Sequence, residues 1–167
     1  MPIIKLFEEH AVLRDAFDLF FIGRDTHLFI NQLQKTQHAR SVVRLIPEVN
    51  FYQARAEGLN ADILLLLMMN DDGEKHVVTG KIYEYIYLNK PIIALDSYHS
   101  QASMIIEKYN FGFVCRSLSE LKDQLIELSL LESLELDSSK ARDKFNVVNT
   151  MSKLIDHLDQ NAFKIIR

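Results

Sequence analysis

Short apolar runs alternate with amphipathic stretches along most of the chain. Runs rich in Ile, Leu, Val and Phe that end near Gly, Pro or polar residues predict strands. They occupy residues 17–23, 41–46, 63–69, 91–95 and 113–116. Stretches with apolar residues at helical spacing, several of them beginning at a residue that can cap a helix, predict helices. They occupy residues 3–16, 28–37, 50–59, 80–88, 101–109, 117–131 and 146–163.

This alternation predicts parallel strands joined by right-handed helical crossovers. The run at residues 63–69 is apolar at every position, which is typical of a central strand covered on both faces. The hydrophobic composition of 48% is enough to bury a core, and no Gly/Ser-rich linker or repeat divides the chain. We therefore expect one α/β domain over residues 1–167, a doubly wound, Rossmann-like parallel sheet in a three-layer αβα sandwich.

Charge and composition narrow the classes of partner. Nineteen basic and 23 acidic residues give a net charge of -4, so nucleic acid is not an expected partner. The single cysteine, Cys115, cannot form an internal disulfide, and the sequence contains no Cys/His metal cluster, so no metal site is expected. The N-terminal residues lack a signal-peptide core, and no apolar run is long enough to span a bilayer. These features predict a cytoplasmic protein without a transmembrane segment.

Ligands of doubly wound folds bind beyond the carboxyl ends of the strands, and one loop there carries a candidate site. Thr79, Gly80 and Lys81 stand at a predicted helix start, where free backbone N–H groups and the helix dipole attract a phosphate. Glu84 follows Lys81 by three residues on nearly the same helix face, where a carboxylate can accept hydrogen bonds from sugar hydroxyls. An ordinary surface ion pair between Lys81 and Glu84 explains the same spacing.

Two segments also carry a family resemblance, ADILLLL at residues 61–67 and TGKIYEYIYLNKPIIAL at residues 79–95. Together they resemble the C-terminal, donor-binding half of retaining GT-B glycosyltransferases of the large family-4 type. DLFFIG at residues 18–23 and MIIEKYNFGFVCR at residues 104–116 extend the resemblance in the same order over nearly the whole chain. It implies that Glu84 binds the ribose of a nucleotide sugar, such as a UDP- or GDP-sugar, and that the helix start faces the diphosphate. It further implies a metal-free role in glycan or polysaccharide biosynthesis, with no cofactor beyond the nucleotide-sugar donor.

The sequence departs from this family at three places. His76 stands eight positions before Glu84, where the family has a second acidic residue, and it could contact the sugar or be an exposed loop histidine. Many members open this half with a strand and a basic, diphosphate-binding loop that is not recognised here. The sheet is therefore expected to lack a central strand. Arg24, after the Gly23 turn, could replace the missing phosphate contact or be a solvated loop arginine.

The third departure is that no acceptor-binding half is recognised. Because a GT-B enzyme reacts in the cleft between its halves, this chain alone is not expected to transfer sugar, and no catalytic residue is assigned. An N-terminal acceptor-binding domain or a partner chain would be needed, and a partner could bring the protein to a membrane surface.

Two other functions remain open. The first is a non-catalytic, truncated or split glycosyltransferase-like module that binds a partner. The second is a flavodoxin-like or receiver-like signalling domain, suggested by the predicted sheet and by Lys90 and Pro91. Gly23 and Arg24, however, stand where its acidic pair would be. The donor sugar, the base, the acceptor and the oligomeric state are open at this point.

Overall fold

Five short parallel strands form two sheets in the computed structural model, which describes residues 1–68, 80–131 and 145. In the first sheet β1 (Leu19–Ile22) pairs with β2 (Val43–Ile46). The second has the order β3 (Leu64–Leu67), β4 (Ile92–Leu95), β5 (Gly112–Cys115). Each strand falls inside or within one residue of a predicted apolar run. The α/β class is therefore confirmed, while a doubly wound arrangement stays a prediction.

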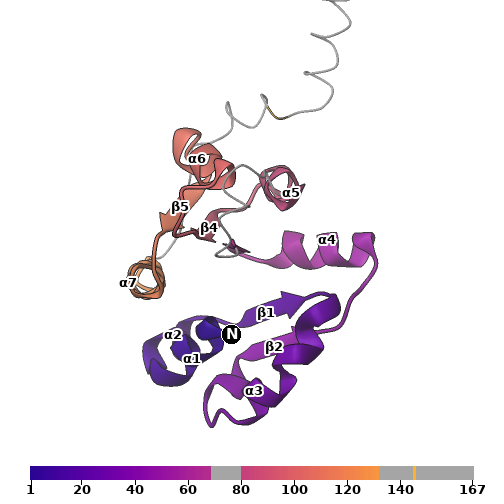
Figure 1. Cartoon of the computed structure of the whole chain (residues 1–167), viewed down its shortest axis with the longest axis vertical. Helices are drawn as coiled ribbons and strands as arrows, with labels where there is room; N and C mark the ends of the chain where they lie inside the picture. Colours follow the sequence, from indigo (N-terminus) through magenta and orange to yellow (C-terminus); the bar gives the residue numbers. More distant parts are fainter. Residues whose placement is uncertain (69–79, 132–144, 146–167) are drawn as a thin grey trace, which may run out of the picture.

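Helices connect the strands (Figure 1). They are α1 (Pro2–Glu9), α2 (Ala11–Ala16), α3 (Ile30–Gln34), α4 (Phe51–Asn60), α5 (Gly80–Leu88), α6 (Gln101–Lys108) and α7 (Leu118–Ser129), with 3-10 turns η1 (Arg24–Phe29) and η2 (Ala39–Ser41). The helix expected at residues 146–163 lies outside the described residues.

The helix predicted at residues 3–16 is instead two helices. His10 separates α1 from α2 with an extended backbone, φ -121° and ψ 106°. Arg14 of α2 stabilises the break, because its Nη1 donates to the carbonyls of Phe7 at 2.8 Å and Glu8 at 2.7 Å. These carbonyls belong to the last turn of α1, where no backbone N–H of the same helix is placed to donate to them. The segment predicted at residues 28–37 is similarly divided between η1 and the shorter α3.

The strand at residues 63–69 was expected at the centre of one sheet, and this prediction is wrong. β3 lies at an edge, and β4 is the middle strand, with Ile92, Ile93 and Ala94 at most 1% exposed. Leu65 and Leu67 of β3 are only half-buried. The physical reason is that, within the described ranges, no strand pairs with the second edge of β3 or of β1.

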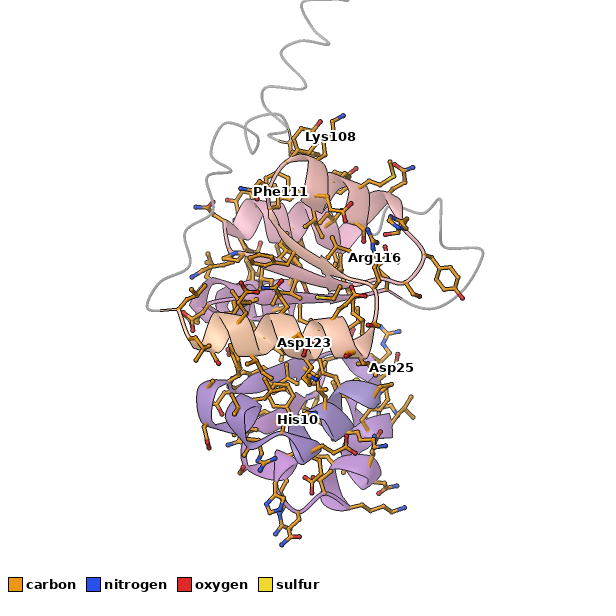
Figure 2. The ribbon with its side chains drawn as sticks, turned by 90° about the vertical axis from the view of Figure 1, so that its left-hand side faces the viewer. His10, Asp25, Lys108, Phe111, Arg116 and Asp123 are labelled. Carbon is orange, nitrogen blue, oxygen red and sulfur yellow. The ribbon has the colours of Figure 1, made fainter. Side chains whose placement is uncertain are left out.

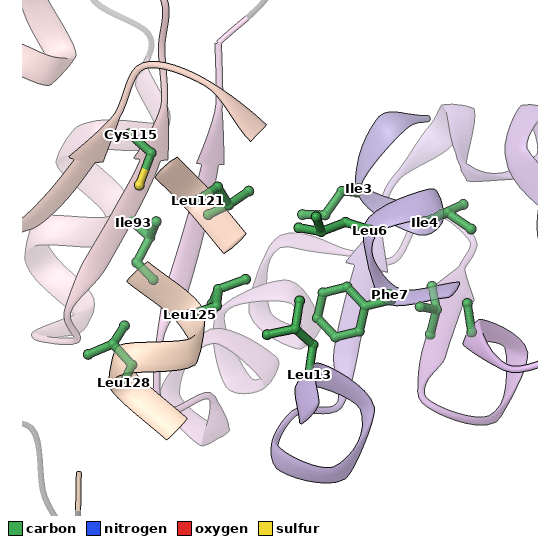
Figure 3. Close-up of a cluster of buried hydrophobic side chains, with 12 residues drawn as sticks. Ile3, Ile4, Leu6, Phe7, Leu13, Ile93, Cys115, Leu121, Leu125 and Leu128 are labelled. Atoms are coloured by element: carbon green, nitrogen blue, oxygen red, sulfur yellow. The ribbon is translucent and has the colours of Figure 1, made fainter. Parts of the chain in front are cut away.

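One hydrophobic cluster nevertheless joins the two sheets. Leu121, Leu125 and Leu128 of α7 lie between Ile93 and Cys115 on one side and the apolar residues of α1 and α2 on the other (Figure 3). β1 and β2 contribute to the same cluster. A second cluster on the opposite face joins α5 and α6 to β3, β4 and β5.

The carboxyl ends of both sheets face the same side of the molecule. In Figure 2, Asp25, which follows β1, and Arg116, which follows β5, lie on one side, and Phe111, before β5, lies on the other. The strands of the two sheets therefore run in the same general direction, although the sheets are not hydrogen-bonded to each other.

Glu8 ties α1 to η2. Its carboxylate accepts the backbone N–H groups of Gln37 at 2.9 Å, His38 at 2.8 Å and Ala39 at 2.7 Å. The amide of Ala39, followed by those of Gln37 and His38, outweighs the cost of desolvation and lowers the pKa of Glu8 to about 2. Three otherwise unpaired donors at the start of η2 are thus satisfied by one side chain.

This contact makes stability depend on pH. Because the folded-state pKa of Glu8 lies below the unfolded value of about 4.3, its contribution is complete above that pH and is lost as the pH falls toward 2. We expect Glu8→Gln to lower the melting temperature at pH 7, with the difference from wild type shrinking between pH 4.5 and pH 2. Thermal melts across that range measure it. Glu9→Gln is the control, because Glu9 pairs with Lys5 at 3.5 Å on the exposed surface of α1. Equal pH dependence in both variants would contradict the assignment.

Candidate functional site

A groove of about 1070 Å³ lies between β1 and β3, and we call it the inter-sheet groove. Its walls are residues 19–22 and residues 63–67, and α4 and α5 flank it. The guanidinium of Arg55 on α4 lies 4.0 Å from the ring centroid of Tyr87 on α5, so a cation–π contact joins the two helices.

Two of the predicted site residues line this groove. α5 begins at Gly80, as predicted, and Lys81 and Glu84 from its first turns both contribute to the groove wall. Both side chains are exposed. Because α5 connects the parallel strands β3 and β4, its N-terminus lies toward the carboxyl end of β3. The Lys81 cation, the amides of the first helical turn and the Glu84 carboxylate come together there. Such a set can bind an anion and neighbouring hydroxyl groups.

Thr79 and His76 lie outside the described residues. Their predicted roles, capping of the helix at the anion site for Thr79 and contact with the sugar for His76, stay predictions.

Gly23 and Arg24 do not belong to the groove wall. Arg24 forms a two-pronged ion pair with Glu48, with Nε to Oε2 at 3.2 Å and Nη2 to Oε1 at 3.1 Å. The hydrogen bonds that Arg24 donates to Glu48 raise the pKa of the Arg24 guanidinium, and the same bonds lower the pKa of the Glu48 carboxyl group. Arg24 therefore holds the turn after β1 against the turn after β2. A phosphate contact by Arg24 would have to compete with this carboxylate.

A buried carboxylate at the end of β4 was not anticipated from the sequence. Asp96 is 2% exposed and accepts the backbone N–H groups of Tyr98 at 2.9 Å and Ser100 at 2.7 Å, as well as the Ser103 hydroxyl. Burial raises its pKa, but the hydrogen bonds from Ser103, Tyr98 and Ser100 outweigh burial, so the net pKa is lowered. The available signal was an aspartate directly after the apolar run PIIAL with serines four and seven residues later.

Arg116 completes this cluster at the carboxyl edge of β4 and β5. It donates to the Asp96 carbonyl at 3.2 Å and to Glu107 Oε1 at 2.7 Å. Its Nη1 also lies 3.8 Å from Asp96 Oδ2. Asp96 and Arg116 are thus paired with protein groups, so the cluster positions the loop between β4 and α6.

No helix in residues 1–68 and 80–131 is long and apolar enough to cross a membrane. Comparison of the chain with protein-family models, with curated proteins and with solved structures found no match.

Proposed function

We propose that this chain is the donor-binding half of a retaining, GT-B-type glycosyltransferase in glycan or polysaccharide biosynthesis. In this proposal a nucleoside diphosphate sugar, such as a UDP- or GDP-sugar, binds at the start of α5. The observation that carries the proposal is the placement of Lys81 and Glu84 on one groove wall, at the helix start that follows β3. The family resemblance of residues 61–67 and 79–95 supports the same placement.

Each group has a defined task in this proposal. The backbone amides of the first turn of α5 and the Lys81 ammonium bind the diphosphate, which leaves when the bond between the sugar and the phosphate oxygen breaks. Glu84 accepts hydrogen bonds from the two ribose hydroxyls, so it discriminates a nucleotide from simple pyrophosphate. A second domain or a partner chain binds the acceptor, because the reaction needs a cleft that closes between two halves.

The second candidate is a binding module without transferase activity. Two observations favour it: Arg24 is paired with Glu48, and the sheet is divided between β1 and β3. In neither candidate does the purified chain transfer sugar, and only the donor-binding half requires a nucleotide site, because the module binds its partner with or without a nucleotide. They differ once an acceptor-binding partner is added, because only the donor-binding half of an enzyme then gains activity.

Substitution of Glu84 tests the nucleotide site. We expect Glu84→Ala to weaken binding of UDP or GDP by about 10- to 100-fold, because a lost hydrogen bond to a charged group costs about 1.5–3 kcal/mol. Binding of pyrophosphate should stay within about twofold of wild type, since it has no ribose. Titration calorimetry measures both ligands.

Glu57→Ala is the matched control, because Glu57 is an exposed glutamate of α4 in the wall of the same groove. It removes the same charge near the other end of the groove, beside the amino ends of the strands. A similar loss of nucleotide affinity in both variants would indicate a general charge effect and would contradict the role of Glu84.

A further inference from the structure

Among residues 1–68 and 80–131, no strand pairs with the backbone edge of β1 that faces the inter-sheet groove. Leu19 N–H donates to Val42 O at 2.9 Å and Gly23 N–H donates to Ile46 O at 3.1 Å, so alternate residues beginning at Leu19 face β2. Successive residues of a strand direct their N–H and C=O groups to opposite edges. The backbone groups of Phe20 and Ile22 therefore face the groove.

β3 presents a matching edge from the other side. Leu64 N–H donates to the carbonyl of Pro91, directly before β4, at 2.9 Å, and Met68 N–H donates to the carbonyl of Leu95 in β4 at 3.1 Å. The backbone groups of Leu65 and Leu67 therefore face the groove. The Leu65 carbonyl accepts a long hydrogen bond of 3.4 Å from the Tyr85 hydroxyl. The Tyr85 hydroxyl thus donates to the carbonyl that a backbone N–H of a neighbouring strand would bind on this edge.

The groove is apolar where these edges face each other. Phe20 and Phe51 line the groove and are 54% and 55% exposed, and no residue of α4 is buried. The opposite face of both sheets is covered by the cluster around α1, α2 and α7. A strand between β1 and β3 would have one face on that cluster and the other toward α4 and α5. Both faces would be buried, so its residues would all be apolar.

The amino end of the groove is acidic. Asp18 directly precedes β1, Asp62 lies two residues before β3, and Glu57 lies near the end of α4; all three line the groove. A strand that runs parallel to β1 and β3 has its amino end beside these carboxylates. Lysine or arginine immediately before the apolar run would complement their charge.

We propose that the inter-sheet groove receives a β-strand from a partner polypeptide, parallel to β1 and β3, apolar along its length and preceded by basic residues. Its backbone pairs with Phe20 and Ile22 on one side and with Leu65 and Leu67 on the other, which unites the two sheets in the order β2-β1-partner-β3-β4-β5. Addition of a strand to exposed edges is a known mode of peptide recognition, in which backbone bonds supply affinity. This partner site goes beyond nucleotide binding and does not depend on it.

Amide hydrogen exchange with a synthetic peptide tests the proposal. The probe is acetyl-KKVIVVIG-amide, and acetyl-KKVIPVIG-amide is its matched control, because proline removes a backbone donor and disrupts pairing. In the protein alone we expect the amides of Phe20, Ile22, Leu65 and Leu67 to exchange rapidly. The probe should slow them by at least about tenfold, and the proline peptide should not.

Two results would overturn the proposal. The first is protection of these amides in the protein alone, which would show that another segment of this chain or a second copy fills the groove; light scattering at several concentrations separates these two. The second is absence of protection at saturating probe.

A charge exchange checks the direction of the strand. The double variant Asp18→Lys and Asp62→Lys replaces two exposed aspartates at the amino end of the groove. We expect it to bind acetyl-EEVIVVIG-amide at least about tenfold more tightly than acetyl-KKVIVVIG-amide, the reverse of the wild-type preference. An unchanged preference would contradict a parallel strand with its basic end at Asp18 and Asp62.

Discussion

Gly112→Ala is expected to remove much of the stability of the folded chain. Gly112 begins β5 with φ +154°, a conformation that L side chains rarely adopt. A Cβ there would collide with the carbonyl oxygen of Ile92 and lie 2.6 Å from its nitrogen. β4 cannot move away, because it is the buried middle strand of its sheet. Backbone strain and overpacking each cost about 1–3 kcal/mol, so we expect a loss of about 2–6 kcal/mol.

Urea denaturation measures this loss, and Gly80→Ala is the matched control. A Cβ at Gly80 meets nothing within 4 Å, and the residue opens α5. Alanine there should be neutral or stabilising by up to about 1 kcal/mol. An unfolding free energy of Gly112→Ala within about 0.5 kcal/mol of wild type would show that β4 and β5 do not approach each other as closely as described.

Asp96→Asn is expected to cost about 2–4 kcal/mol. The substitution keeps the size of the side chain but replaces one acceptor oxygen with an NH₂ donor. Because Tyr98, Ser100 and Ser103 all donate to the carboxylate, at least one donor loses its partner. Hydrogen bonds to a charged group contribute about 1.5–3 kcal/mol each, and Arg116 also loses its opposing charge at 3.8 Å.

Chemical denaturation of Asp96→Asn and of Asp123→Asn tests this role. Asp123 is an exposed residue of α7 that pairs with its neighbour Lys122 at 3.0 Å, so its substitution should change stability by less than about 0.5 kcal/mol. Since the pKa of Asp96 is lowered in the folded state, the difference between wild type and Asp96→Asn should narrow as the pH falls below about 3.9. Similar losses in the two variants would contradict a buried, hydrogen-bonded Asp96.

The sequence predicted helix bounds well where the deciding contact joins residues that are close in the chain. Asn50 was expected to cap a helix, and it does so in a capping box with Gln53. The expected bounds of α5 match because the apolar residues Ile82 and Ile86 are spaced for burial on one helix face. The Ser117 cap of α7 likewise accepts the Glu120 amide. These features depend on residues within one or two turns of each other.

Features that depend on distant residues were not predicted. The break at His10 is held by Arg14 and by the bonds of Glu8 to η2, a segment about thirty residues away, so helical periodicity alone did not reveal it. The apolar run at residues 63–69 indicated burial on both faces but not which strands would be its neighbours. The order of strands in a sheet depends on how the helical crossovers place them, which the apolar pattern does not encode. A strand whose unpaired edge borders the inter-sheet groove can therefore be as apolar as a central strand.

The candidate site was predicted only in part, because some of its contacts join neighbouring residues and others join distant ones. Lys81 and Glu84 share one groove because a single helix carries both. Arg24 was considered as a phosphate contact, but its partner Glu48 follows a different strand, so the ion pair could not be derived from spacing. Asp96 was missed because its partners Ser100 and Ser103 lie in the turn and helix that follow β4, and the spacing of these residues matches no recognised motif.

Nuclear magnetic resonance of the ¹⁵N-labelled chain with UDP and with GDP tests the donor site most directly. At millimolar nucleotide we expect the backbone amides of Gly80, Lys81 and Glu84 to shift, and the amides of the distant helix α3 to stay unchanged. Pyrophosphate should shift Gly80 and Lys81 but leave Glu84 nearly unaffected. If neither nucleotide shifts residues 80–84 at millimolar concentration, the start of α5 is not a nucleotide site and the proposed donor-binding function is contradicted.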